Sequence, residues 1–189
     1  LFALWADPLT FGWIYQFWND PYKAVLNKQN NVVGFEIASK TQLFSEQYMV
    51  EWLLQNALGR KWMEVCQRNG WTAIVESTGT LNTLENKRQA FRSERTAGNV
   101  ELTDLMELNG KLEEYWCYYV HQPIDDTTNS PTSIREVRLL DPACGSGHFL
   151  VIALDYLVQL YKEEAKHRGE EGQEQWSNAR IVESILENN

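Results

Sequence analysis

The chain has 189 residues, a mass of 22.0 kDa and a formal net charge of −9. This length suits one domain or two small ones, and 43% apolar residues with 8 Trp, 8 Tyr and 7 Phe exclude collagen-like, low-complexity and mostly disordered classes. Acidic residues outnumber basic ones both before and after residue 130, so composition alone argues against a nucleic-acid-binding polycation. The chain starts at Leu1 and stops inside a helical pattern, which favours a fragment of a longer protein.

Cysteine usage and hydropathy favour a cytoplasmic protein without membrane contact. The three cysteines, at positions 66, 117 and 144, include no CxxC pair, which favours a reducing compartment over a disulfide scaffold or a zinc site. No apolar run approaches the roughly 18–20 residues of a membrane span, and the first residues lack the pattern of a secretory leader. His121 and His167 have no partners at metal or triad spacing, so no metal is expected.

The first segment predicts helices with a buried aromatic face. Asp7-Pro8 and Asp20-Pro21 each place a capping residue before a proline and so predict the starts of two short helices. Residues 27–31 predict a loop and residues 32–37 an extended segment. One helical face that we expect in the core follows i, i+3, i+4, i+7 spacing and consists of Phe11, Ile14, Tyr15 and Trp18.

The middle of the chain predicts further helices. Ser45 is expected to cap a helix with Glu46 in its first turn and Gly59 as its stop. Residues 60–68 continue or restart this helix, with Trp62 and Val65 inward, and Gly70 ends it. Residues 78–119 have mixed polarity with helical spacing. The apolar face of the Ser45 helix is predicted to be Tyr48, Met49, Trp52 and Leu53.

The sequence changes character after a Pro-, Asp- and Ser-containing stretch at residues 121–134, which predicts a linker. Residues 137–140 predict a short strand, residues 142–147 a Gly-rich turn and residues 147–162 a helix that is apolar on both sides. A helix of this kind is typical of a doubly wound α/β sheet. A charged insertion over 163–178 and a final helix around 181–186 follow.

The turn Asp141-Pro142-Ala143-Cys144-Gly145-Ser146-Gly147-His148-Phe149 is the sharpest motif in the chain. Glycines between a strand and a helix let the backbone approach a ligand closely. A P-loop would need Gly-Lys-Ser/Thr here, and a dinucleotide site would need a further Gly or Ala three residues after Gly147. His148, Phe149 and Leu150 follow Gly147 instead, so both phosphate-binding readings fail.

This turn closely resembles the first motif of N6-adenine DNA methyltransferases, Asp-Pro-Ala-x-Gly-Ser-Gly-x-Phe. The resemblance implies that the loop binds S-adenosylmethionine, with the Asp141 carboxylate toward the ammonium group of the ligand and the glycines admitting its main body. We expect Cys144, at a position that varies in the family, to be a small buried thiol. The cofactor-binding residues that the motif implies are Asp141, Pro142, Ala143, Cys144, Gly145, Gly147 and Phe149.

An upstream segment, Lys40–Ser45 followed by Tyr48-Met49-Val50, is similar to the region that precedes this motif in the same enzymes. There a Thr or Ser before a helix touches the carboxylate of the cofactor, which implies Thr41, Phe44 and Ser45 as further binding residues. Ser45-Glu46 stands where Thr-Pro is usual, so simple helix capping remains an alternative. Together with Gly12–Phe17, these segments resemble the adenine-specific methyltransferases of bacterial BREX phage-defence systems (the phage-growth-limitation X type), which are related to type II restriction–methylation enzymes.

The resemblance implies an α/β protein that is mostly helical. Its parts would be a helical N-terminal region, residues 1–130, and the first β-α unit of a Rossmann-like methyltransferase domain, residues 131–189. The catalytic Asn/Asp-Pro-Pro-Tyr motif does not follow Asp141; Asn19-Asp20-Pro21-Tyr22 imitates it upstream but has one proline. We therefore expect the chain alone to bind cofactor weakly or not at all and to have no turnover.

The implied parent transfers a methyl group from S-adenosylmethionine to adenine N6 in DNA, in phage defence or restriction–modification. Its implied partners are DNA, through parts mostly outside this chain, and other defence-system proteins. Two alternatives stay open: an RNA or protein-amide methyltransferase of the same fold, and a non-catalytic interaction module.

Overall fold

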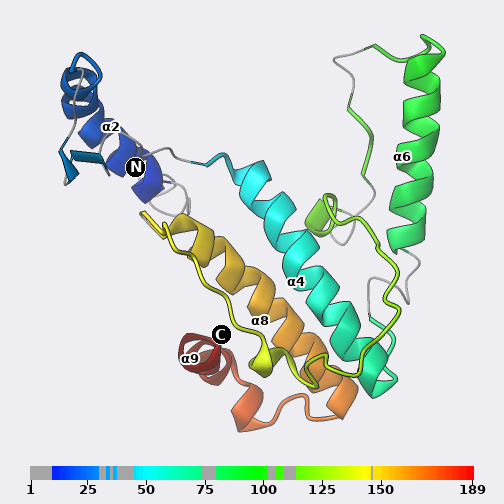
Figure 1. Ribbon diagram of the computed structural model, residues 1–189. Coiled ribbons are helices and arrows are strands. Elements are labelled where there is room, and N and C mark those ends of the chain that lie inside the picture. The colour runs from blue at the N-terminus through cyan, green and yellow to red at the C-terminus, as the bar shows by residue number, and fades with distance from the viewer. Residues whose placement is uncertain are drawn as a thin grey trace. The chain divides into compact units, whose positions relative to one another are not determined.

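The computed structural model describes residues 10–29, 33–34, 36–37, 45–73, 80–101, 105–108, 114–145 and 147–189. In these ranges the chain is mostly helical, and none of the described residues forms a β-strand (Figure 1). The helices are α2 (Thr10–Leu26), α4 (Gln47–Asn69), α6 (Thr80–Thr96), α8 (His148–Arg168) and α9 (Asn178–Asn188), with the 3-10 turns η1 (Ile134–Glu136) and η2 (Glu174–Trp176). The helical part of the expected fold is therefore confirmed.

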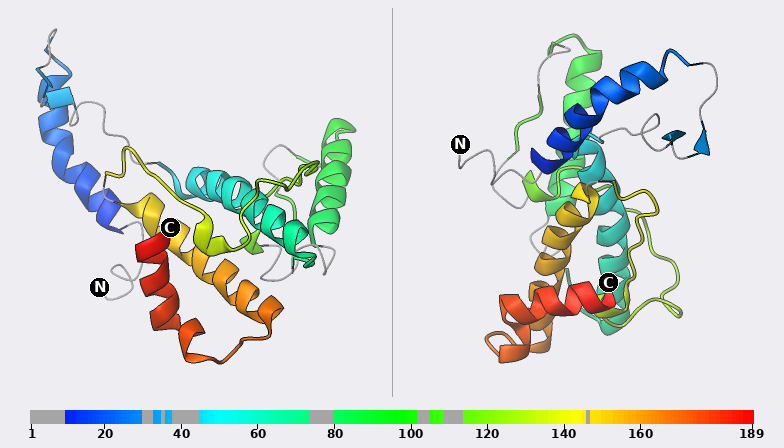
Figure 2. Two further views of the ribbon diagram at one scale, coloured as in Figure 1. Left: turned by 60° about the horizontal axis from the view of Figure 1, so that its bottom comes forward. Right: turned by 90° about the vertical axis from the view of Figure 1, so that its left-hand side faces the viewer.

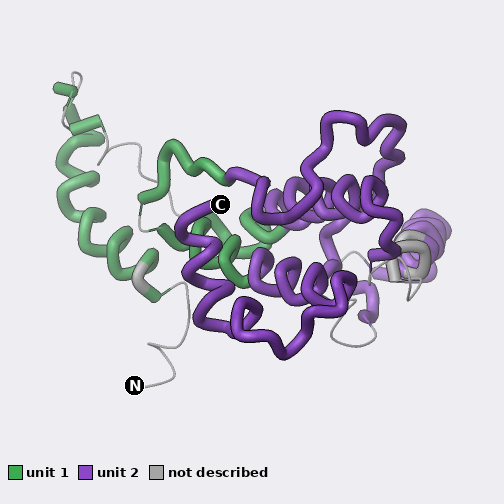
Figure 3. The backbone as a smooth tube through the Cα atoms, turned by 90° about the horizontal axis from the view of Figure 1, so that it is seen from below, with its two compact units in different colours: residues 1–51, 139–155 green, residues 52–138, 156–189 purple. Residues whose placement is uncertain are grey.

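The chain divides into two compact units, each built from two segments (Figure 3). Unit 1 comprises residues 1–51 and 139–155, and unit 2 comprises residues 52–138 and 156–189. Helices α4 and α8 both begin in unit 1 and continue into unit 2. The boundary at 130/131 concerns the domains of a longer protein and stays a prediction.

The core of unit 2 lies between α4 and α8, which run side by side there (Figures 1 and 2). A buried hydrogen bond of 2.8 Å joins them, from the Gln55 amide to the Tyr156 hydroxyl. Apolar side chains of the two helices are also buried together, and their removal from water supplies the main favourable term in packing α4 against α8. The buried apolar residues on the two helices include Leu54, Leu58, Trp62, Val65 and Cys66 from α4 and Tyr156, Leu157, Leu160, Tyr161 and Ala165 from α8.

The buried face of α4 differs in part from the prediction. Trp62 and Val65 point inward as expected, at 2% and 0% exposure. The first turns of α4 are apolar on more than one face, so periodicity alone could not select the side that packs. The predicted set Tyr48, Met49, Trp52 and Leu53 is about half exposed, and the buried positions are Val50, Leu54 and Leu58.

Gly59 does not end α4, contrary to expectation, because the helix continues through it to Asn69. A Cβ atom at Gly59 would lie 2.8 Å from the Tyr119 ring and 2.9 Å from the Trp116 ring. The glycine therefore serves close packing of these two buried aromatic rings against the helix. Gly70 does end the helix, with φ of 69° and a 2.8 Å hydrogen bond from Trp71 N–H to the Cys66 carbonyl.

Helix α2 corrects two predictions about the N-terminal segment. It runs through Pro21, so Asp20-Pro21 does not start a helix, although the proline lacks the N–H that a helical hydrogen bond needs. Asp7-Pro8 lies outside the described residues. The predicted core face is also wrong, since Ile14, Tyr15 and Trp18 are 43%, 46% and 82% exposed.

Residues 121–133 are irregular, as predicted for a linker, but they are tied to the second half of α4. Arg60 donates a hydrogen bond to the Gln122 side chain at 2.5 Å, and Asn69 donates to the Thr132 carbonyl at 2.9 Å. Arg68 donates to the Thr128 carbonyl at 3.2 Å and also to the Ser130 carbonyl. This segment is thus part of unit 2 rather than a free connection.

The C-terminal elements follow the predicted order with longer helices. Residues 137–140 have no partner strand among the described residues, and a strand requires one to form its ladder. Helix α8 extends to Arg168, six residues beyond the prediction, so the charged insertion begins as helix. Its Leu150 and Val151 are 40% and 46% exposed, so α8 is not covered on every side in this chain. None of the described helices combines the length and hydropathy needed to span a bilayer.

Candidate functional site

The Gly-rich turn before α8 depends on two glycines in the left-handed region. Gly145 has φ of 53° and Gly147 has φ of 79°. The Gly147 N–H donates to the Cys144 carbonyl at 2.7 Å, and the Gly147 carbonyl accepts the first bond of α8 from Val151 at 3.0 Å. Because residues with a Cβ rarely adopt these angles, the two glycines determine the path of the turn.

The turn is open to solvent. A Cβ atom at Gly147 would meet nothing within 4 Å, and one at Gly145 would meet only the Ala143 carbonyl, at 3.9 Å. Pro142, Ala143 and Gly145 are exposed. Cys144 is also exposed and not a buried thiol as predicted. The backbone of the turn can therefore be approached from outside.

Asp141 opens the turn with a local hydrogen bond. Its Oδ1 accepts the Ala143 N–H at 3.0 Å, which holds the carboxylate over the first residues of the turn. The side chain is half-buried, and its second oxygen has no hydrogen-bond partner among the described residues. That oxygen can accept a hydrogen bond from a cationic or neutral donor.

The structure brings one upstream candidate to the turn. The His148 Nε2 atom lies 3.1 Å from the Ser45 carbonyl oxygen, a hydrogen-bond distance. Both residues belong to unit 1. Phe149 is half-buried in the next position of α8, whereas Thr41 and Phe44 lie outside the described residues.

Ser45 does not cap α4 in the predicted way. The helix begins at Gln47, and the first carbonyl to accept bonds from the helix is that of Glu46, from Met49 at 3.0 Å and Val50 at 3.3 Å. Glu46 is therefore the cap residue and Ser45 precedes it. This leaves the Ser45 hydroxyl outside the helix, on the same residue whose carbonyl oxygen contacts His148.

The tetrapeptide that imitates a catalytic motif lies inside α2. The Asn19 side-chain amide donates to the Tyr15 carbonyl one turn earlier at 2.9 Å. The Tyr22 hydroxyl donates to Glu36 at 3.3 Å. A helical segment with these local bonds does not form a loop that could hold a flipped base.

Comparison with known proteins gives two relatives. No protein-family model matches the chain, and no solved structure matches it. It is 29% identical over 167 residues, 86% of the chain, to "Adenine-specific methyltransferase PglX" of Lacticaseibacillus casei (strain Zhang). It is also 29% identical, over an alignment 196 residues long that covers 98% of the chain, to "Adenine-specific methyltransferase BrxX" of Escherichia coli O9:H4 (strain HS).

The alignments cover 11% and 12% of these two relatives, so the chain spans about a tenth of their length. They confirm the resemblance that the turn and the upstream segment predicted. Over most of its length, the chain is thus similar to BREX-type adenine-specific methyltransferases of the PglX and BrxX kind.

Proposed function

We propose that the chain is the cofactor-loop region of a longer enzyme that transfers a methyl group from S-adenosylmethionine to adenine N6 in DNA. The observation that carries the proposal is the turn Asp141–Phe149, in a chain similar to two adenine-specific methyltransferases. Phage defence or restriction–modification is the proposed setting, in the cytoplasm, with DNA and other defence proteins as partners.

The residues present fit S-adenosylmethionine. Its ammonium group matches the second oxygen of Asp141, which has no partner among the described residues. Its carboxylate matches the positive N-terminal end of α8, which begins directly after Gly147. The open space at Gly145 and Gly147 admits the body of the ligand against the backbone. When bound, the cofactor supplies the activated methyl group, and these residues bind and orient it.

The remaining site residues would contact the cofactor from the side of the turn and the upstream segment. Ser45 lies next to the turn through the contact of its carbonyl with His148, which supports a role for the upstream segment. Thr41 and Phe44 are proposed from the resemblance alone. Pro142 would keep the turn rigid, and Phe149 would pack against the ligand from the first turn of α8.

The fold proposal extends beyond the described helices. Residues 137–140, which lead directly into the turn, would form the first strand of a Rossmann-like sheet once neighbouring strands of the longer protein pair with them. The domain boundary would then fall near residues 130/131. The catalytic motif and the DNA-reading surface would lie in parts of the longer protein outside this chain.

Calorimetry with S-adenosylmethionine on the full-length parent tests the proposal. We expect the wild-type parent to bind and Asp141→Ala to weaken binding by about tenfold or more, since a carboxylate–ammonium contact is lost. Asp155→Ala is a matched control, because Asp155 is an exposed aspartate further along α8. Absence of binding by the parent, or equal affinity of both variants, would contradict a cofactor site at this turn.

Substitution of two matched glycines distinguishes an effect on cofactor binding from a general effect on stability. Gly147 and Gly172 have similar φ values, 79° and 81°, and both have open space around a new Cβ. Gly147→Ala and Gly172→Ala should therefore destabilise the fold similarly, by about 1–2 kcal/mol. Only Gly147→Ala should weaken cofactor binding by the parent.

The acceptor is tested with radiolabelled cofactor. Methyl transfer by the parent to adenine-containing DNA, but not to RNA or protein, is the expected result. Transfer to RNA or protein alone would favour the alternative acceptors, and cofactor binding without any transfer would favour an interaction module. We expect the 189-residue chain itself to show no turnover.

A further inference from the structure

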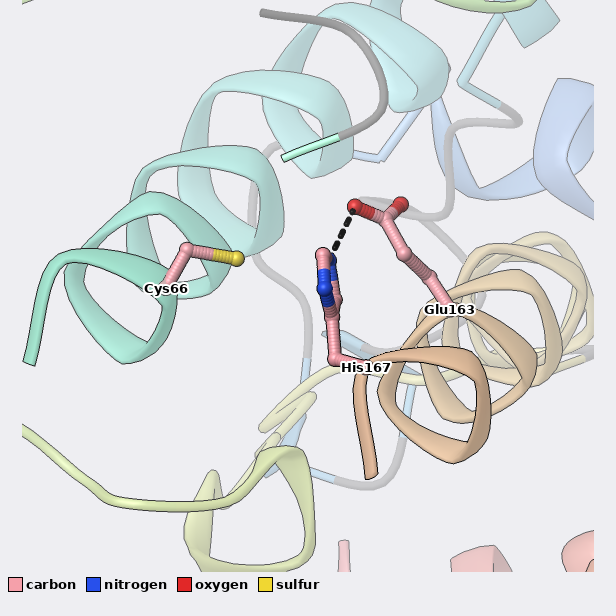
Figure 4. A group of neighbouring side chains, drawn as sticks. All are labelled: Cys66, Glu163 and His167. Carbon is pink, nitrogen blue, oxygen red and sulfur yellow. Dashed lines mark ion pairs between the residues drawn. The ribbon is translucent and has the colours of Figure 1, made fainter. Parts of the chain in front are cut away.

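A second group of chemistry-bearing side chains lies in unit 2, away from the turn. Cys66 on α4 and Glu163 and His167 on α8 bring a thiol, a carboxylate and an imidazole together. Their donor atoms all lie within 4.8 Å of one another. Figure 4 shows the Cys66 thiol directed from one helix toward the two side chains of the other. Thiolate, imidazole and carboxylate are the side-chain ligand types found in protein zinc sites.

The distance between the Glu163 and His167 side chains on α8 suits two ligands of one metal ion. His167 Nε2 lies 3.6 Å from Glu163 Oε1, and this buried nitrogen has no hydrogen-bond partner among the residues that the structure describes. The separation is too long for a hydrogen bond. Two ligands of one tetrahedral zinc ion, bound at about 2.0–2.3 Å, are separated by about 3.3–3.8 Å. The Glu163–His167 pair is therefore already spaced for a common ion.

Regular helical backbone fixes the positions of Glu163, His167 and Cys66. Glu163 and His167 are one turn apart on α8 and so face the same side. Cys66 lies in the last turn of α4, where its carbonyl accepts the Trp71 N–H at 2.8 Å after the reversal at Gly70. The same reversal stacks the Trp71 ring on the His167 ring, with centroids 5.2 Å apart and planes 3° apart. This stacking orients the imidazole, as outer contacts do in metal sites.

Burial and charge favour an ion over an organic ligand. Cys66 is 1% exposed, and the side chains of Glu163 and His167 are 10% and 20% exposed. A substrate could not reach such a thiol, whereas a single ion needs only to approach the three neighbouring donor atoms. A thiolate and a carboxylate together carry −2, which neutralises Zn²⁺ in a poorly hydrated site.

We propose that Cys66, Glu163 and His167 bind one Zn²⁺ ion that clamps α4 to α8. Binding draws the sulfur inward by about 1 Å at most and leaves the fourth position to water or to the second Glu163 oxygen. Sequence spacing did not predict this site, because its ligands come from two distant helices and contain no CxxC or His-His pair. The prediction that His167 lacks metal-ligand partners considered spacing along the chain only.

The test uses the 189-residue chain after removal of metal with a chelator. Equilibrium dialysis with metal analysis should find one Zn²⁺ per chain, and Zn²⁺ should raise the midpoint of thermal unfolding. Co²⁺ should give a thiolate-to-metal charge-transfer absorption. Cys66→Ser should abolish that absorption, and Glu163→Gln and His167→Gln should weaken metal binding by about tenfold or more.

The controls are an exposed cysteine, Cys144→Ser, and an exposed histidine, His121→Gln, which should bind metal like the wild type. If a ligand variant fails to fold, the cobalt spectrum and zinc stoichiometry of the wild-type chain still decide. A folded wild-type chain that shows no thiolate–cobalt absorption overturns the proposal. Equal zinc retention by folded ligand variants does so too, and leaves a Glu163–His167 ion pair packed beside a thiol.

Discussion

The carboxylate of Glu164 accepts a 2.9 Å hydrogen bond from the backbone N–H of Ile134, 30 residues earlier in the chain. The same carboxylate accepts the Ser133 hydroxyl at 3.1 Å and pairs with Arg168 at 2.7 Å. Glu164 is 1% exposed, so its charge depends on these donors in place of water. The bonds hold the segment before residues 137–140 against α8 within unit 2.

Glu164→Ala should lower the free energy of unfolding by about 2–4 kcal/mol, because it orphans the buried Ile134 N–H and breaks a buried charge pair. Urea denaturation of the chain measures this. Glu183→Ala is the control, since Glu183 pairs with Arg180 on α9 but is 53% exposed. It should change stability by less than about 1 kcal/mol. Similar effects of the two variants would show that the Glu164 contacts contribute no more than a surface pair.

Gln55 is a second buried polar group, and both its amide nitrogen and its amide oxygen form hydrogen bonds. Its amide donates to the Tyr156 hydroxyl at 2.8 Å, and its carbonyl oxygen accepts the Tyr118 N–H at 2.7 Å. Gln55→Leu retains the volume but removes both of these buried hydrogen bonds, so stability should fall by about 1–3 kcal/mol. Gln47→Leu, at an exposed position of the same helix, should change it by less than about 0.5 kcal/mol. Urea midpoints compare them, and a more stable Gln55→Leu would refute the role of this network.

The sequence predicted the local features that depend on few neighbouring residues. Gly70 ends α4 as expected, α8 follows the Gly-rich turn, and α9 buries Ile181 and Ile185 of the last predicted helix. In each case a glycine or a regular apolar spacing suffices to specify the structure. The similarity to adenine-specific methyltransferases likewise came from one short motif.

The predictions that proved wrong concern contacts between segments that are distant in the sequence. Glycine is common at helix ends, and Gly59 was therefore predicted to end the helix. Its actual role is to leave room for the rings of Trp116 and Tyr119, which lie far along the chain. Ile14, Tyr15 and Trp18 of α2 follow helical spacing but are exposed, because spacing shows which residues share a face and not whether another element covers that face. Spacing along the chain likewise did not predict the cluster of Cys66, Glu163 and His167, because these residues become neighbours only when α4 packs against α8.

Gly59→Ala should destabilise the chain although alanine favours helix. The gain in helix propensity is about 1 kcal/mol, whereas a Cβ 2.8–2.9 Å from two buried rings must displace them at a cost of about 1–3 kcal/mol. The expected net loss is about 1–2 kcal/mol, measured by thermal or urea unfolding. In a Tyr119→Ala background the loss from Gly59→Ala should shrink. A net gain of stability in the wild-type background would mean that the rings yield freely.

We expect the stability of the chain to depend on pH through Glu64. Its carboxylate is 2.7 Å from the Lys61 ammonium group and accepts the Ser130 hydroxyl at 3.2 Å. Burial raises the pKa of Glu64, but the hydrogen bond and charge of Lys61 and the further bonds from Ser130 and Arg60 outweigh burial and hold the pKa below its usual value of 4.5. The folded state therefore favours the ionised form.

For a carboxyl group whose pKa is lower in the folded state, the extra stability is full above the unfolded pKa and is lost as pH falls through the folded value. Glu64→Gln should therefore be less stable than the wild type at neutral pH and lose less stability on acidification below pH 4.5. Urea unfolding at a series of pH values measures both effects. Lys61→Met should weaken the acid dependence in the Glu64 background and have no such effect once Glu64→Gln is present. Parallel pH curves for wild type and Glu64→Gln would show that Glu64 has the same affinity for protons in both states.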